Sequence, residues 1–126
     1  MIEKIVLDYL SSVLTETIGS TVVAIPVSME VPEQPTPKKY VVIEKTGSSK
    51  TNRIPTANIA VQSCAASLLD AATLNEQVKA AMENIVTLAA VGGCRLDTDY
   101  NFTDTSTKTY RYQAIFRITY MEAQHV

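Results

Sequence analysis

The stretch from Pro55 to Val86 changes its hydrophobic period without an intervening loop. Up to Ala66 small or apolar side chains alternate with polar ones, which is typical of a β-strand with one covered face. From Leu68 onward the apolar positions recur every three or four residues, which predicts an amphipathic helix. A strand that leads straight into a helix restricts the chain to folds in which the helix turns back and covers the sheet.

The two halves of this stretch each have a predicted buried face. The covered face of the strand consists of Ala57, Ile59, Val61, Ser63 and Ala65. The apolar stripe of the helix consists of Leu68, Ala71, Leu74, Val78, Ala81, Met82 and Ile85. We expect the solvent face of the helix to carry Asn75, Glu76, Lys79 and Glu83. Ser67 followed by Asp70 resembles a capping box with Asp in the usual place of Glu, so the helix is predicted to begin directly after Ser67.

The first part of the chain is predicted to form a helix and an edge strand. Apolar residues between Ile2 and Leu14 lie at helical spacing, and we expect this amphipathic helix to end at Gly19. The β-branched segment from Thr21 to Val27 predicts a strand. Because Pro26 lacks a backbone N–H, this strand is expected at a sheet edge, followed by an extended, proline-rich connection.

The next strand is predicted from Tyr40 to Lys45, ending at Gly47. Its continuous apolar centre indicates that both faces are at least partly covered. The polar segment Thr46 to Arg53 then reads as a long, projecting hairpin loop that carries Lys50 and Arg53.

Two alternating strands, Cys94 to Phe102 and Tyr110 to Tyr120, predict a C-terminal antiparallel hairpin. One hairpin face is aromatic and the other is charged, as expected where helices cover only one side of a sheet. The complete order predicts one α+β domain over residues 1–126, with a mainly antiparallel sheet of about five strands. The N-terminal and central helices are expected on one face of that sheet.

Composition excludes several functional classes. Apolar residues make up 46% and charged residues 19%, which favours a folded soluble domain with no membrane span. The formal charge of −2 gives no electrostatic case for nucleic-acid recognition. The start MIEKIVLDYL contains an early acid and a helical stripe, so we expect no secretion signal and a protein that stays in the cytosol.

No motif for catalysis, or for binding a metal or a cofactor, is complete in this sequence. Asp97, Asp99 and Asn101 match the first three ligand positions of a calcium loop, but Phe102 and Lys108 occupy the positions that require Gly and Glu. We therefore interpret these residues as the outer face of a strand. No nucleophile with an adjacent base is visible, so we expect neither an enzyme nor a cofactor.

The cysteines are expected to be structural. Cys64 and Cys94 lie on separate predicted strands without CxxC spacing, which suits neither a disulfide framework nor a zinc site. Both are interpreted as buried free thiols.

A family resemblance covers most of the chain. It is carried by the stretches IAVQSCAASLLDAATLNEQVKAAM, DTDYNFTDTSTKTYRYQAIFRITY and VPEQPTPKKYVVIEKTG. These resemble small tail-completion proteins, similar to tail terminators, of long-tailed bacteriophages and of prophages in Gram-positive bacteria. One departure is Cys64, which stands where this family is expected to have an aromatic residue.

The resemblance implies a non-enzymatic structural protein of the virion tail, assembled in the cytoplasm of the bacterial host. Its subunits would form a ring, commonly a hexamer, that caps the tail tube and joins it to the head-tail connector. A neighbouring neck or head-closure protein is the nearest alternative. A monomeric cytosolic module that binds a peptide or small ligand is another. For a ring, the candidate interface residues are Lys50, Arg53, Asp97, Asp99, Arg111 and Arg117.

Overall fold

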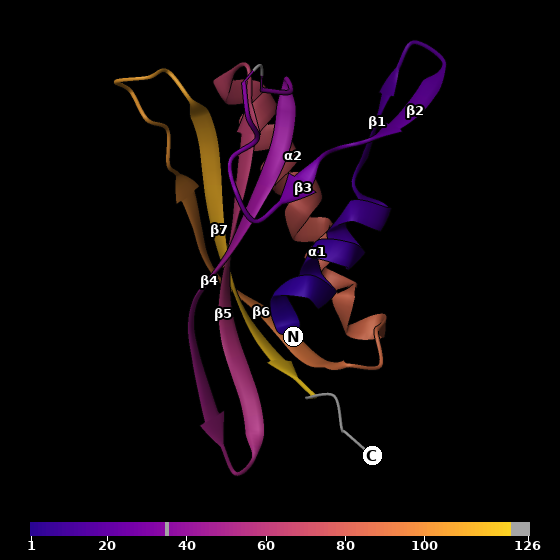
Figure 1. Cartoon of the computed structure of the whole chain (residues 1–126), viewed down its shortest axis with the longest axis vertical. Helices are drawn as coiled ribbons and strands as arrows, with labels where there is room; N and C mark the ends of the chain where they lie inside the picture. Colours follow the sequence, from indigo (N-terminus) through magenta and orange to yellow (C-terminus); the bar gives the residue numbers. More distant parts are fainter. Residues whose placement is uncertain (35, 122–126) are drawn as a thin grey trace.

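The computed structural model describes residues 1–34 and 36–121 and shows a twisted five-stranded sheet with both α-helices on the same side (Figure 1). This confirms the predicted α+β class. In chain order the elements are α1 (Ile2–Val13), β1 (Thr15–Ile18), β2 (Thr21–Ala24), β3 (Val27–Ser28), β4 (Lys39–Thr51), β5 (Ile54–Ala65), α2 (Leu68–Glu83), the 3-10 helix η1 (Ile85–Thr87), β6 (Val91–Asn101) and β7 (Tyr110–Tyr120).

The strand-to-helix unit forms as predicted. Strand β5 ends at Ala65, and the Ser67 hydroxyl accepts a hydrogen bond of 3.1 Å from the backbone N–H of Asp70 at the start of α2. This bond satisfies one of the free N–H groups of the first helical turn. Of the predicted apolar stripe, Leu68 is 41% exposed, Ala81 is half-buried, and Ile85 is buried in η1. The remaining stripe residues, Ala71, Leu74, Val78 and Met82, are buried in α2. Asn75, predicted on the solvent face, is instead buried, and its partner is described below.

The strand order of the main sheet is β3-β4-β5-β7-β6. Every neighbouring pair is antiparallel except β3 and β4, which confirms a mainly antiparallel sheet. The predicted edge strand from Thr21 to Val27 is wrong in its bounds, because only Val27–Ser28 joins the sheet edge, beside Val41 and Val42. Pro26 precedes this short strand, and its carbonyl accepts from the Val41 N–H.

The helix α1 ends earlier than predicted. The chain becomes extended at Leu14, and residues Thr15–Ile18 pair with Thr21–Ala24 in a separate two-stranded hairpin. Gly19 therefore does not end the helix but lies in the hairpin turn with a φ of 64°. The run TETI favours the extended state because three of its four residues are β-branched. This hairpin projects at the upper right of Figure 1.

Strand β4 continues past its predicted end at Lys45. A register shift lies between Lys45 and Gly47, after which the strand pairs with β5 as far as Thr51. Only Asn52 and Arg53 form the turn, with φ angles of 52° and 65°. Positive φ at both central residues is the geometry of a tight two-residue hairpin turn. The prediction of a long loop from Thr46 to Arg53 is thus wrong; the segment projects, but as a β-ribbon (Figure 1, bottom).

The two faces of the sheet are covered differently. Helices α1 and α2 cover what we call the inner face, where they enclose the main core with Ile59, Phe116 and Ile118 of the strands. On the opposite, outer face a small buried cluster consists of Tyr40, Val42 and Cys64. The prediction that β4 is partly covered on both faces is confirmed.

Candidate interaction surfaces

Side-chain amides cross three strands on the outer face. The Gln62 amide of β5 donates to the side-chain oxygen of Gln113 in β7 over 3.0 Å, and the Gln113 amide donates to the hydroxyl of Tyr100 in β6. Gln113 is only 8% exposed. A buried amide with satisfied partners orders its surroundings rather than destabilising them. This amide row, Gln62, Gln113 and Tyr100, therefore holds polar side chains in fixed positions on the outer face.

A groove of about 510 Å³ lies at one end of this face. Its floor consists of Tyr40, Gln62 and Cys64. One wall is the connection between β3 and β4, and the other is the tip of the β6–β7 hairpin with Arg111. The wall residues are Val31, Gln34, Thr36, Pro37, Lys38, Ala65, Ala66, Thr107, Lys108, Thr109 and Arg111. Among the residues that the structure describes, the lining thus contains three cationic side chains and no carboxylate.

Arg111 is held in place by Phe102, the residue that follows β6. Its Nε donates to the carbonyl oxygen of Phe102 over 2.7 Å, and its guanidinium lies 4.6 Å from the centre of the Phe102 ring. Burial raises the pKa of the Cys64 thiol, while a hydrogen bond from Tyr40 and the charge of Arg111 act in the opposite direction. The charge of Arg111 therefore acts on Cys64, which lies on the floor of the groove.

Arg117 lies elsewhere on the outer face. It stands opposite Asn58 of β5 and Arg95 of β6 in the strand register. Arg95 in turn makes an ion pair of 3.5 Å with Asp97. Like charges directly opposite each other on a sheet are destabilising unless an anion lies nearby. Arg95 and Arg117 together form a second basic surface, which is separate from the groove.

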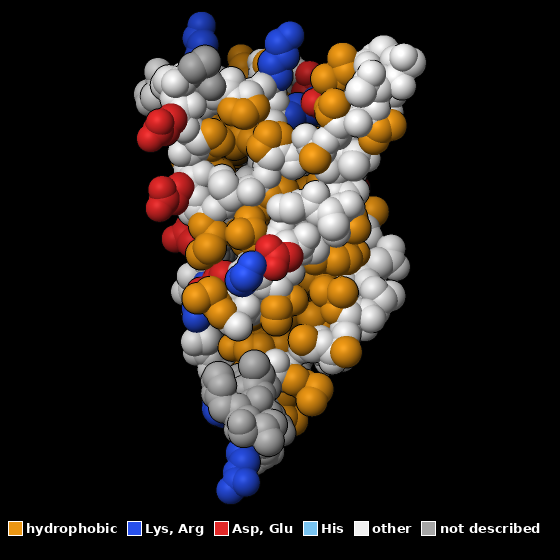
Figure 2. Space-filling model, turned by 45° about the vertical axis from the view of Figure 1, so that its right-hand side comes forward, with side chains coloured by type: hydrophobic (Ala, Val, Ile, Leu, Met, Phe, Trp, Pro, Cys, Tyr) orange, Lys and Arg blue, Asp and Glu red, His pale blue; other side chains and the backbone are white. Residues whose placement is uncertain are grey.

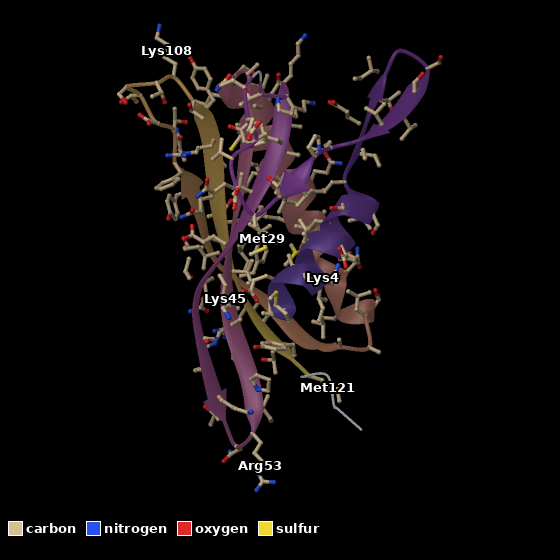
Figure 3. The ribbon with its side chains drawn as sticks, in the orientation of Figure 1. Lys4, Met29, Lys45, Arg53, Lys108 and Met121 are labelled. Carbon is tan, nitrogen blue, oxygen red and sulfur yellow. The ribbon has the colours of Figure 1, made fainter. Side chains whose placement is uncertain are left out.

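The projecting ribbon carries the other two predicted cations. Arg53 lies at its tip and points away from the body of the protein (Figure 3). Lys50 stands opposite Pro55 in the ribbon, and the neighbouring Ile54 is 51% exposed. The space-filling view narrows toward this end, and a basic side chain forms its lower tip (Figure 2).

The two predicted acidic interface residues do not share a face. A register shift between Leu96 and Thr98 leaves Asp97 as the extra residue of a β-bulge. An extra residue reverses the alternation of the side chains that follow. Asp97 therefore pairs with Arg95 on the outer face, whereas Asp99 turns to the inner face and to α2. The expectation of one continuous charged hairpin face is wrong for this reason.

Asp99 has partners within its own chain. Its Oδ2 accepts from the Asn75 amide over 2.8 Å and from the Lys79 ammonium over 3.0 Å. The hydrogen bond from Lys79 is the main cause that lowers the pKa of the Asp99 carboxyl. Lys79 also lies 2.9 Å from Glu76, which contributes most to raising the pKa of its ammonium group. This network gives the buried Asn75 amide N–H group a partner, whereas the Asn75 Oδ1 atom has none in the described part of the chain.

We predict that Asp99→Ala lowers the free energy of unfolding by about 2 kcal/mol near neutral pH, because it removes the partner of the buried Asn75 amide. The pKa of Asp99 is lowered in the folded state, so its stabilisation is complete above the pKa of an unfolded aspartate. It is lost as the pH falls through the folded value. Urea unfolding at pH 7 and pH 3 should therefore show the difference from the parent shrinking in acid.

The matched control for this prediction is Asp97→Ala, two residues away on the outer face. Its partner Arg95 is exposed, so we expect a change within about 0.5 kcal/mol at either pH. Equal losses for the two variants, or a loss at Asp99 that does not depend on pH, would contradict the proposed role of the Asp99 network.

Both cysteines are free thiols. Cys64 is buried and Cys94 is half-buried, so the predicted burial is right for Cys64 and only partly right for Cys94. Burial raises the pKa of Cys94 to about 11. A thiol with a raised pKa carries little thiolate near neutral pH and is a poor nucleophile.

Sequence reasoning missed the groove and the amide row. The even-numbered positions of β5 and the odd-numbered positions of β7 do place Gln62 and Gln113 on one side of their strands. Nothing in the sequence pattern indicated that they touch, or that the residues around Lys38 pass over the outer face. Of the predicted interface residues, only Arg111 contributes to the groove.

Within residues 1–34 and 36–121, no group of three or more His, Cys, Asp or Glu side chains is placed to hold a metal ion. No helix in that part of the chain has the length and apolar character needed to cross a membrane. No protein-family model matches the chain, and no curated protein is significantly similar to it.

Proposed function

We propose that this chain is a structural tail-completion subunit of a long-tailed phage or prophage. In this role it forms a ring at the end of the tail tube and joins the tube to the head-tail connector. A neighbouring neck or head-closure position is the alternative within the same proposal. The role is non-enzymatic, needs no cofactor, and belongs to the virion tail after assembly in the host cytoplasm. The sequence resemblance to tail terminators supports it.

The projecting ribbon is the structural observation that carries the proposal. Strand β3 covers β4 only at Val41 and Val42, so no strand in the described part of the chain pairs with the β3-side edge of β4 beyond that point. An open strand edge is a template for another chain, and a two-stranded ribbon alone is only marginally stable in water. Such a ribbon gains stability from a partner, and a neighbouring subunit is the partner that we propose.

A head-to-tail contact between the ribbon and another surface of the next subunit closes into a ring when the rotation allows. The cations Lys50 and Arg53 would face acidic groups of the neighbour or of the tube. Contacts between exposed charges are individually weak and sensitive to salt. We therefore expect monomers or small species in dilute solution, and a ring, of six subunits by family analogy, at high concentration or on the tail end.

The test is the double reversal Lys50→Glu and Arg53→Glu. We expect an almost unchanged melting temperature, because both residues are exposed, together with loss of ring formation or tail completion. Light scattering over a concentration series and electron microscopy of tails measure the two outcomes.

A pair of single reversals controls for net charge. Arg53→Glu should impair assembly, whereas Lys4→Glu on the exposed side of α1 should not. If the double variant still forms tails of normal length that join heads, the ribbon tip contacts only solvent and is not the interface. The interface would then have to lie on the sheet.

A second candidate function is a monomeric module that binds a peptide or small ligand, and the groove favours it. The volume of the groove is within the range of about 300 to 1,000 Å³ that is common for ligand sites. A chain that stays monomeric at high concentration, even with tail tube protein present, would favour this candidate over the ring.

A further inference from the structure

The groove on the outer face has a one-sided charge. Arg111 lies beside its floor, Lys38 is exposed on one wall, and Lys108 stands at the rim, at the end of the β6–β7 hairpin (Figure 3). Within residues 1–34 and 36–121 no carboxylate lines the groove, although the whole chain has a formal charge of −2. A cationic lining on an acidic protein favours an anionic ligand at this place.

Arg111 is oriented before any ligand arrives. Its contacts with the carbonyl and ring of Phe102 use the Nε atom and one face of the guanidinium group. No other hydrogen bond or ion pair of its side chain was found in the described part of the chain, which leaves the terminal Nη groups for a ligand. A fixed guanidinium group can bind a carboxylate through two parallel hydrogen bonds, with little entropy lost on binding.

The rest of the lining suits a peptide better than a nucleic acid. Tyr40 is only 7% exposed, so its ring offers no surface on which a base could stack. The lining also contains apolar groups of Val31, Pro37 and Ala66, together with the amides of Gln34 on one wall and Gln62 on the floor. Apolar surface with a few placed polar groups is typical of sites for peptides and small ligands.

We propose that this groove binds an extended acidic peptide segment of a partner protein. One carboxylate pairs with Arg111, and further carboxylates lie near Lys38 and Lys108 at the rim. Apolar side chains of the peptide contact the walls. The proposal goes beyond ring assembly and does not depend on it, because every residue of the groove belongs to one chain.

The test uses the isolated chain and a fluorescein-labelled, end-blocked hexapeptide of alternating Glu and Val. Fluorescence anisotropy should show saturable binding at low salt. Replacing the Glu residues of the peptide by Gln should weaken binding by about tenfold or more, since charge-assisted hydrogen bonds are lost. Added salt should weaken the binding of the acidic peptide and leave any binding of the Gln peptide unchanged.

Variants locate the site. Arg111→Gln should weaken binding about tenfold, and Lys38→Gln, an exposed position whose change leaves the Phe102 contact intact, about threefold. Arg117→Gln is the matched control, because Arg117 lies on the same strand and face but outside the groove. Its affinity should equal that of the parent.

Several results would overturn the proposal. They are the absence of binding by the acidic peptide, equal binding of the Gln peptide, or an equal loss of affinity in the Arg117→Gln variant. Stronger competition by a single-stranded oligonucleotide than by unlabelled acidic peptide would assign the groove to nucleic acid instead. Because no tail components are present, a negative result here leaves the ring proposal intact, and failed ring assembly leaves the groove proposal intact.

Discussion

Val78→Asp is expected to destabilise the fold by about 3 to 5 kcal/mol, because it places a carboxylate in the core without a partner. Val78 has no exposed surface and lies in the middle of α2, against the inner face of the sheet. Unfolding in urea, followed by circular dichroism, should show a much lower midpoint with an unchanged slope.

The control for this variant is Ala80→Asp, which adds the same group to the exposed side of the same helix. It should cost only the difference in helix propensity, about 0.7 kcal/mol or less. A Val78→Asp protein that melts within about two degrees of the parent would contradict the assignment of the buried stripe, since a loss of 1 kcal/mol already shifts the melting temperature by more.

Phe116→Ala has the second largest expected effect, a loss of about 3 to 5 kcal/mol. Phe116 is 2% exposed and lies in the main core on the inner face of β7. Its removal leaves a cavity that the strands and α2 cannot close without moving. The same urea titration measures the loss.

Ile115→Ala is the matched control, because it lies next in the same strand but points to the outer face and is half-buried. We expect a loss of about 1 to 2 kcal/mol there, in line with the smaller apolar area removed from water. Equal losses at the two positions would mean that both faces of the sheet are covered alike, which contradicts the architecture.

Short-range patterns predicted the elements whose causes are local. The sequence predicted the period of β5 and α2, the Ser67 cap and the alternation of β7. Each of these features depends on residues within a few positions of one another. Burial on one face then follows from the period alone. The α+β class and the projection of the Lys50 and Arg53 segment were predicted for the same reason.

Other local elements were misread because two conformations were open to them. The TETI segment could continue the helix or become extended, and its pairing with Thr21–Ala24 decided for a hairpin. The polar run after Lys45 looked like a loop, but pairing with β5 extends it as a ribbon to Thr51. In both cases hydrogen bonds to a partner strand fixed the extended conformation, which the predicted element boundaries had not included.

The candidate sites depended most on tertiary structure. A single extra residue at Asp97 turns Asp99 from the outer to the inner face, where Asn75 and Lys79 bind it. No local pattern marks that bulge, because it arises from the register between β6 and β7. The groove beside Arg111 likewise exists only because two segments far apart in sequence pass over one end of the outer face. The sequence by itself thus determined which faces of β5, β7 and α2 are apolar and that α2 begins after Ser67, since these follow from local period and capping. The register and the path of the connections, which only the packed chain decides, determined which charged side chains meet.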